Sequence, residues 1–295
     1  MFEILSYERL TPNIFMMDIY APRVASHARP GQFVICIAVD HGERIPLTIC
    51  DYDENKGSVT IVVQEIGAST VKMGKMKVGQ RLADFVGPLG RPSEFTEMDI
   101  DELKEKRIVF VAGGVGTAPV YPQVKWLKER GIDSDVIIGA KNKSLVILED
   151  KFKAVAKNLY ITTDDGSYGF KGMVTDRLSA LISDGKNYDL CISIGPMIMM
   201  KFVSKLTEQL GIKTIVSLNP IMVDGTGMCG ACRVMVGGEV KFACVDGPEF
   251  DGHLVDYDGA MKRQSIYKTE EGKAYLKEIE GNTHSGGCGI CRGDE

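Results

Sequence analysis

Three cysteines and an aspartate toward the C-terminal end of the chain have the spacing of a metal-binding loop. They follow the pattern Asp-x4-Cys-x2-Cys-x11-Cys and are Asp224, Cys229, Cys232 and Cys244. A [2Fe-2S] cluster is commonly held by Cys-x4-Cys-x2-Cys and a distant fourth cysteine, because a tight loop must bring three thiolates to one compact cluster. The small residues that allow this close approach are Gly225, Gly227, Gly230 and Ala231. The segment therefore predicts an iron–sulfur site with an aspartate at the first ligand position.

That aspartate leaves the identity of the fourth ligand open. Asp224 could ligate iron through a carboxylate oxygen, or Cys288 or Cys291 of the C-terminal Cys-x2-Cys pair could fold back to supply it. The three cysteines could instead bind zinc, or no metal at all. An ionised aspartate has the charge of a thiolate but is a harder donor, so a cluster with an altered reduction potential is compatible with it. Ligation by Asp224 is the preferred interpretation.

Composition narrows the class of protein. Of the 295 residues, 44% are hydrophobic and 25% are charged, which is typical of a folded globular chain of two or three domains. The formal net charge of −5 and the lack of a long Lys/Arg run argue against nucleic-acid binding. The N-terminus lacks the pattern of a signal peptide, and no apolar stretch has the length of a membrane span, so we expect a cytoplasmic protein.

Two changes in the sequence pattern along the chain predict three domains. Residues 1–98 hold short alternating segments such as 33–39 and 58–66, which predicts an antiparallel β-barrel. Residues 99–219 alternate apolar strands with helices, which predicts an α/β doubly wound parallel sheet. Residues 220–295 hold five of the eight cysteines, so we expect a small [2Fe-2S] module and tail there. The expected strands of the middle domain are 107–114, 135–140, 159–163, 190–195 and 214–218, and its expected helices are 119–131, 174–184 and 197–211.

Two glycine-containing turns of the middle domain are candidates for binding a dinucleotide. The first follows a buried strand, and its glycines and helix-start N–H groups could receive a pyrophosphate. Pro119 fits the first helical position there, and Gly131 fits the position just after the helix. The second turn also leads from a strand into a helix, so both would border one crevice of an open sheet. The candidate residues are Gly114, Gly116, Thr117, Pro119, Gly195, Pro196 and Met197.

Acidic residues after a neighbouring strand bear on the choice of dinucleotide. Asp164 and Asp165 follow the strand 159–163 and could accept hydrogen bonds from ribose hydroxyls, although a solvated acidic loop is an equally good interpretation. Their carboxylates would repel a 2′-phosphate and favour NAD(H). Lys141 and Lys143 favour NADP(H) instead. NAD(H) is the preferred expectation.

The order of these features resembles the ferredoxin reductase superfamily. A β-rich domain comes first, then Gly-Gly-x-Gly-x-x-Pro, and then Gly-Pro-x-x-Met-Met. Members often carry a cysteine directly before the Gly-Pro pair, near the nicotinamide. Here Ile194 holds that place, and Cys191 lies four residues before Gly195. The resemblance implies that Gly116, Thr117 and Gly195 line the seat of the nicotinamide.

Three segments of the N-terminal domain carry a resemblance to flavin-binding motifs. The sequence Arg-Ile-Pro-Leu-Thr at 44–48 is similar to the motif of the dihydroorotate dehydrogenase electron-transfer branch. The resemblance implies that Arg44 donates to a phosphate of FAD and that Thr48 bonds a ring nitrogen of the flavin. Two later segments resemble those that hold the isoalloxazine and the pyrophosphate. The implied flavin-binding residues are Arg44, Pro46, Leu47, Thr48, Val62, Val63, Gln64, Gly67, Ser69 and Thr70.

The whole chain resembles the small subunit of NADH-dependent reduced ferredoxin:NADP oxidoreductase, an electron-bifurcating transhydrogenase. The resemblance rests on Asp224, since the dihydroorotate dehydrogenase subunit has four cysteines. It implies a heterodimer in which this chain exchanges hydride between NAD(H) and its FAD and relays electrons through the [2Fe-2S] cluster. The larger subunit would carry another FAD and [4Fe-4S] clusters and would bind NADP(H) and ferredoxin. No side-chain acid or base is expected.

Two other functions remain open. A dihydroorotate dehydrogenase electron-transfer subunit would be active only with an orotate-reducing partner. A zinc-binding adaptor, built on a reductase fold that has lost its activity, would not be an enzyme.

Overall fold

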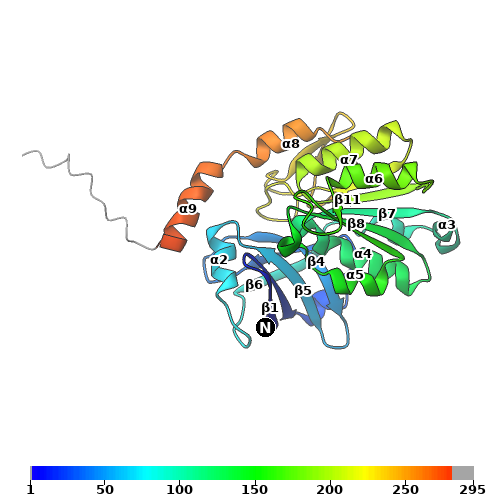
Figure 1. Ribbon diagram of the computed structural model, residues 1–295. Helices are drawn as coiled ribbons and strands as arrows, with labels where there is room; N and C mark the ends of the chain where they lie inside the picture. Colours follow the sequence, from blue (N-terminus) through cyan, green and yellow to red (C-terminus); the bar gives the residue numbers. More distant parts are fainter. Residues whose placement is uncertain (1, 281–295) are drawn as a thin grey trace, which may run out of the picture.

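Two sheets of different construction account for most of the molecule (Figure 1). The computed structural model describes residues 2–280, so Cys288 and Cys291 lie outside the described residues. An antiparallel barrel is followed by a parallel α/β sheet and a small cysteine-bearing C-terminal module, which confirms the expected fold class. Among the described helices, none combines the length and apolar character that a membrane span requires.

The N-terminal sheet is antiparallel throughout and has the strand order β1-β2-β5-β4-β3-β6. Backbone hydrogen bonds of Ile4 with Gly79 and Gln80 join its first strand to the segment that precedes its last, which closes the barrel. Its interior is filled by alternate residues such as Val34 and Cys36 of β3 and Ile61 of β5. Its elements are β1 (Ile4–Thr11), β2 (Ile14–Tyr20), α1 (Pro22–Ala25), β3 (Phe33–Ile37), β4 (Ile45–Asp53), β5 (Ser58–Gln64), α2 (Ala68–Gly74) and β6 (Asp84–Leu89).

The second sheet has the order β10-β9-β8-β7-β11-β12-β15 and is parallel except at β15. Helices α4 and α5 cover one face, and α6 and α7 cover the other. Its elements are η1 (Glu94–Glu97), α3 (Ile100–Lys104), β7 (Ile108–Gly113), η2 (Gly114–Gly116), α4 (Thr117–Glu129), β8 (Ser134–Ala140), η3 (Lys143–Leu145), α5 (Glu149–Val155), β9 (Asn158–Thr163), β10 (Phe170–Lys171), α6 (Val174–Ser183), β11 (Leu190–Ile194), α7 (Met197–Gln209) and β12 (Lys213–Ser217).

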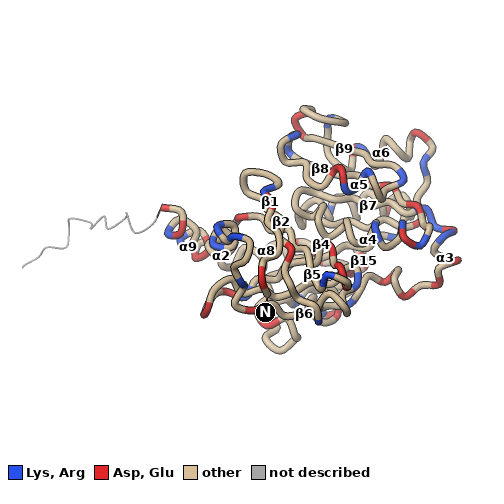
Figure 2. The backbone as a smooth tube through the Cα atoms, turned by 90° about the horizontal axis from the view of Figure 1, so that it is seen from below, with Lys and Arg blue, Asp and Glu red and all other residues tan. Residues whose placement is uncertain are grey.

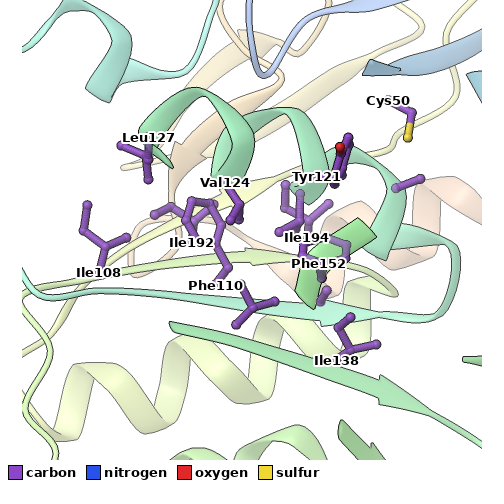
Figure 3. Packing of buried hydrophobic residues seen from close by; sticks show 14 of the residues in the cluster. Cys50, Ile108, Phe110, Tyr121, Val124, Leu127, Ile138, Phe152, Ile192 and Ile194 are labelled. Atoms are coloured by element: carbon purple, nitrogen blue, oxygen red, sulfur yellow. The ribbon is translucent and has the colours of Figure 1, made fainter. Parts of the chain in front are cut away.

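Apolar packing between α4 and the sheet also reaches the barrel. Figure 3 shows Val124 and Leu127 of α4 over Phe110 and Ile192 of the sheet, with Cys50 of β4 at the edge of the same cluster. Lys125 of α4 also forms an ion pair with Asp51 of β4 at 2.7 Å. The barrel strand β4 is therefore held against the first helix of the second sheet.

Helix α4 begins two residues earlier than the sequence suggests. The expected helix started at Pro119, and that expectation is wrong, because α4 starts at Thr117. Pro119 is the third helical residue, where its missing N–H still costs no intrahelical hydrogen bond. The expected end is confirmed: Gly131 has φ +73°, and Ile132 donates its amide to the carbonyl of Leu127.

The C-terminal module contacts both the parallel sheet and the barrel domain. It begins with a hairpin, and its third strand, β15, then pairs with β12 as the edge of the parallel sheet, with Glu249 opposite Ser217. Helix α9 lies beside α2 in both views (Figures 1 and 2), and Glu278 pairs with Lys75 at 2.7 Å. The elements are β13 (Arg233–Val236), β14 (Glu239–Phe242), β15 (Glu249–Asp251), α8 (Tyr257–Gln264) and α9 (Lys268–Glu280). The boundaries after residues 98 and 219 stay predictions.

Candidate functional site

Strand β4 presents its alternate residues to two different environments. Ile45 and Leu47 pack on the barrel core, so Pro46 and Thr48 lie on the opposite face of the strand. Cys50 belongs to that opposite face and is buried beside α4 (Figure 3). Of the candidate flavin residues on β4, Leu47 therefore offers its backbone to a ligand on the outer face, whereas Pro46 and Thr48 offer side chains.

Arg44 ties the start of β4 to the loop of the candidate metal site. Its Nε donates to the carbonyl of Val223 at 2.7 Å, and its Nη2 donates to the carbonyl of Asp224 at 3.1 Å. The sequence suggested that this guanidinium contacts a flavin phosphate, which stays a prediction. The structure adds a second partner, because the same side chain holds the backbone of the first candidate metal ligand.

The second candidate flavin segment, on β5, also alternates. Val62 packs with Ala112 and Ala118 on the side of the second sheet, whereas Val63 lies in the barrel core. Gln64 has the same parity as Val62 and is partly exposed. Val62 and Gln64 can therefore face a ligand between the two sheets, and Val63 can contribute only backbone groups.

The third candidate flavin segment, residues 67–70, lies at the start of α2 and contacts the residue that precedes the first segment. The Ser69 hydroxyl donates to the carboxylate of Glu43, which precedes Arg44. The Thr70 hydroxyl accepts the amide of Gly67 at 3.0 Å and donates to its carbonyl at 2.9 Å. The structure thus brings residues 43–48 and 67–70 together, with the hydroxyl of Thr70 already engaged in holding the turn.

The two glycine turns meet at the centre of the parallel sheet. β7 and β11 are neighbours, and the strand order reverses between them, which is where open α/β sheets bind ligands. A Cβ added to Gly116 would lie 2.5 Å from the carbonyl oxygen of Ile194, and one added to Gly195 would lie 3.1 Å from the amide nitrogen of Gly113. Gly114, at φ +56°, has nothing within 4 Å of its Cβ direction. The turns are therefore close together, with open space beside the first.

A buried hydroxyl at the start of α4 has no partner. Thr117 is fully buried, and its Oγ1 makes no hydrogen bond to any described residue. Buried polar atoms are nearly always paired, so an unpaired hydroxyl beside the first glycine turn fits a polar group of a ligand. In the second turn, Pro196 directly precedes α7, and Met197, the first residue of that helix, is buried. These positions fit a dinucleotide that crosses both turns.

The acidic residues expected near the ribose lie at the same edge of the sheet. Asp164 and Asp165 follow β9 and are exposed, and the amide of Asp165 donates to the carbonyl of Lys141. Hydrogen bonds from the hydroxyl and amide of Ser167 lower the pKa of Asp165, so it stays ionised. Acidic and basic side chains therefore both follow the strands at this edge of the sheet, and the preference for NAD(H) stays a prediction.

The candidate metal loop brings two of its three cysteines into contact. Cys232 and Cys244 are buried with their sulfurs 3.2 Å apart, and Cys229 is exposed. Burial and the neighbouring Cys232 thiol raise the pKa of Cys244 to about 12, so a thiolate there requires a positive partner such as a metal. Backbone amides point at two of the sulfurs: Ala231 at Cys229, and Cys244 at Cys232, each at 3.5 Å. This donor set fits a sulfur-ligated metal.

Asp224 closes the same loop through its carboxylate. Oδ1 accepts the amide of Thr226 at 2.9 Å, and Oδ2 accepts that of Cys229 at 2.8 Å; the Thr226 bond contributes most to lowering the pKa of Asp224. Gly225 and Gly227 have positive φ, as the turn requires. Within residues 2–280 no group of three or more His, Cys, Asp or Glu side chains is arranged to hold an ion. Ligation by Asp224, Cys229, Cys232 and Cys244 therefore stays a prediction.

Only one strand separates these cysteines from the candidate flavin residues. Phe33 and Ile35 of β3 pack in one cluster with Cys232 and Cys244. Phe33 is also the register partner of Thr48 on β4. The metal loop and the outer face of β4 are therefore joined both through β3 and through Arg44.

The thiol of Cys191 is remote from this crevice. It is buried on the α6 and α7 side of the sheet, and burial raises its pKa to about 12. Two residues that sequence reasoning missed contact the metal loop instead. They are Arg91 and Arg263, and no local motif marks them.

Comparisons with known proteins agree with this arrangement. Residues 219–256 match the iron–sulfur cluster binding domain of dihydroorotate dehydrogenase B. A Clostridium beijerinckii protein from the adh 3′ region is 66% identical over the full length of both chains. The dihydroorotate dehydrogenase B (NAD(+)) electron transfer subunit homolog of Thermotoga maritima is 44% identical over 94% of this chain and 95% of its own.

A solved structure supports the same relationship. A chain of the NADH-dependent reduced ferredoxin-NADP oxidoreductase structure, reported for flavin-based electron bifurcation, is 43% identical with a TM-score of 0.87 and covers 95% of this chain and 98% of its own. The expectation of an oxidoreductase with flavin, nicotinamide dinucleotide and iron–sulfur cofactors is confirmed at the level of the family. The chain belongs to the family of dihydroorotate dehydrogenase B electron transfer subunits and their homologues.

Proposed function

We propose that this chain is the smaller subunit of a bifurcating NADH-dependent reduced ferredoxin:NADP oxidoreductase. It exchanges a hydride between NAD(H) and FAD and passes single electrons through a [2Fe-2S] cluster to a larger subunit. That partner carries another FAD and [4Fe-4S] clusters and binds NADP(H) and ferredoxin. The flavin supplies the change from two-electron to one-electron chemistry.

One observation carries the proposal: β4 contacts both the loop of the candidate metal ligands and the helix that follows the first glycine turn. At one end Arg44 binds the loop of Asp224, and at the other Asp51 pairs with Lys125 of the helix that follows the glycine turn. A flavin on the outer face of β4, beside Pro46 and Thr48, would lie between a nicotinamide and the cluster. Electron transfer and hydride transfer both require such proximity.

The residues of this chain act by positioning. The missing Cβ atoms at Gly116 and Gly195 let the two turns lie against each other. The hydroxyl of Thr117, which has no partner among the described residues, would then bind a polar group of the dinucleotide, and Thr48 would orient the flavin ring. Val62, Ala112 and Ala118 are buried in one apolar cluster, which would exclude water from that side of the flavin. Hydride transfer between two cofactors requires no proton donor, so no catalytic acid or base is assigned.

A dihydroorotate dehydrogenase subunit is the second candidate, and the match of residues 219–256 favours it. The bifurcating branch is preferred because the first ligand position holds Asp224 and because the relative from that enzyme spans nearly the whole chain at 43% identity. The two candidates differ in the partner and in the final acceptor.

Purification of the tagged chain from its native cell tests the proposal. We expect one FAD and two irons per chain, and a co-purifying larger flavoprotein whose complex reduces ferredoxin and NAD⁺ when supplied with NADPH. Orotate formation from dihydroorotate by the complex would support the second candidate instead. A colourless chain that holds zinc would contradict both.

A further inference from the structure

Three arginines from outside the metal loop donate hydrogen bonds to its backbone carbonyls. Arg44 reaches Val223 at 2.7 Å and Asp224 at 3.1 Å. Arg263 Nη2 donates to Ala231 at 3.2 Å, and Arg91 Nε donates to Val245 at 3.2 Å. The acceptors Asp224, Ala231 and Val245 are, respectively, a candidate ligand, the residue before Cys232 and the residue after Cys244.

The three side chains come from separate parts of the fold and converge on one loop. Arg44 precedes β4, Arg91 follows β6, and Arg263 lies on α8. None of the three forms an ion pair with a carboxylate among residues 2–280, in contrast to Arg107, which pairs with Asp189 at 2.7 Å. Their charges are therefore not neutralised by a salt bridge in the described part of the chain.

Burial of these charges differs between the three positions. Arg44 and Arg263 are partly buried, and the Nε of Arg263 is fully buried with no hydrogen-bond partner among the described residues. Arg91 is exposed. Because solvent screens an exposed charge, Arg44 and Arg263 should act more strongly on the loop than Arg91.

We propose that Arg44, Arg91 and Arg263 are positioning residues that hold the ligand loop and raise the reduction potential of its cluster. The inference rests on the proposed iron–sulfur function. One-electron reduction by the flavin adds one negative charge to the cluster, so nearby positive charges stabilise the reduced form. A guanidinium group keeps its positive charge throughout the physiological pH range, so its stabilisation of the reduced cluster does not depend on pH there. The arginines thereby favour movement of an electron from the flavin to the cluster.

The test compares full-length holoprotein variants by FAD content, iron content and cluster potential, measured by EPR-monitored redox titration. We expect Arg263→Gln to lower the potential, Arg44→Gln to lower it in protein that retains FAD, Arg91→Gln to lower it less, and each Lys variant to recover part of the shift. Arg233→Gln is the matched control. Arg233 directly follows Cys232, but its side chain is exposed and makes no hydrogen bond or ion pair within residues 2–280, so its replacement should cause the smallest shift.

Each outcome bears on the proposal. Iron-replete Arg263→Gln and Arg44→Gln proteins with the wild-type potential would overturn it, as would an equal shift in Arg233→Gln. If the Gln variants lose iron while keeping FAD, recovery of the cluster in Arg263→Lys supports the proposal, and failure to recover it contradicts the charge-based account. A wild-type chain without iron would refute the proposed function itself, which is a different result.

Discussion

Glu249 of β15 accepts a hydrogen bond from the side-chain amide of Gln123 on α4 at 2.8 Å. The same oxygen, Oε1, also accepts the Ser93 hydroxyl at 2.9 Å. One carboxylate therefore joins the C-terminal module, the first helix of the parallel sheet and the segment that follows the barrel. No Lys, Arg or His of the described chain forms an ion pair with it, and burial raises the pKa of Glu249 to about 7.

This carboxylate should make stability depend on pH. The folded-state pKa lies above the ordinary value of 4.5, so the native state holds a proton that the unfolded chain releases between about pH 4.5 and 7. Stability should be highest at the acid end of that window and fall as the pH rises through 7. We expect the melting temperature of the wild type to drop from pH 5.5 to pH 8 by more than that of Glu249→Gln. Equal drops in the two proteins would contradict this assignment.

The contact between the glycine turns predicts the effect of a single methyl group. In Gly116→Ala the added Cβ would meet the carbonyl of Ile194 at 2.5 Å, so the turns must separate. Overpacking of this kind typically costs about 1–3 kcal/mol of unfolding free energy. We expect a comparable loss in denaturant titrations and a large fall in the rate of flavin reduction by NADH. Gly272→Ala in α9, which has nothing within 4 Å, is the control and should leave both unchanged or slightly raise stability.

The unpaired hydroxyl of Thr117 predicts opposite changes in stability and in binding. Replacement by valine removes a buried polar atom that has no partner within residues 2–280, and such atoms cost about 1–3 kcal/mol. Thr117→Val should therefore unfold at the same or a higher temperature without NADH and should bind NADH more weakly. Thr207→Val provides the contrast, because the Thr207 hydroxyl is fully engaged and its loss should destabilise the chain. Unchanged NADH affinity in Thr117→Val would remove Thr117 from the dinucleotide site.

The ligand role of Asp224 can be separated from its role in the loop. Asp224→Ala removes both the carboxylate and the acceptors for the amides of Thr226 and Cys229, so iron content should fall while FAD stays near one per chain. Asp224→Cys should retain a cluster, with a shifted potential because a thiolate is a softer donor. Metal analysis and redox titration check both. Full iron content in Asp224→Ala, or an unshifted potential in Asp224→Cys, would mean that this residue is not a ligand.

Much of this architecture follows from local pattern. The β-branched run before Gly113 forms the fully buried strand β7, and Gly131 ends α4 as its position suggests. The cysteine spacing predicted a loop that brings three thiolates together; the sulfurs of Cys232 and Cys244 lie 3.2 Å apart, whereas Cys229 is exposed. Short-range periodicity and turn chemistry were sufficient for these features.

Other features depend on pairings that sequence spacing does not encode. The pairing of β15 with β12, the bond from Arg91 to Val245 and the bond from Gln123 to Glu249 each join separate elements, the last two across more than 100 residues. Arg44 was identified, but only for a flavin phosphate, since its second partner becomes visible once the loop is folded against β4. The start of α4 was misplaced because Pro119 is compatible with any position in the first helical turn.

The central claim is that β4 holds a flavin between a nicotinamide and the cluster bound by residues 224–244. Anaerobic mixing of the as-isolated full chain with NADH, followed by stopped-flow absorbance and by freeze-quench EPR, tests it most directly. The account predicts loss of flavin absorbance and then the signal of one reduced [2Fe-2S] cluster per chain at a catalytically competent rate. Complete reduction of the flavin with no reduced-cluster signal, from a chain prepared without exposure to oxygen, would contradict it.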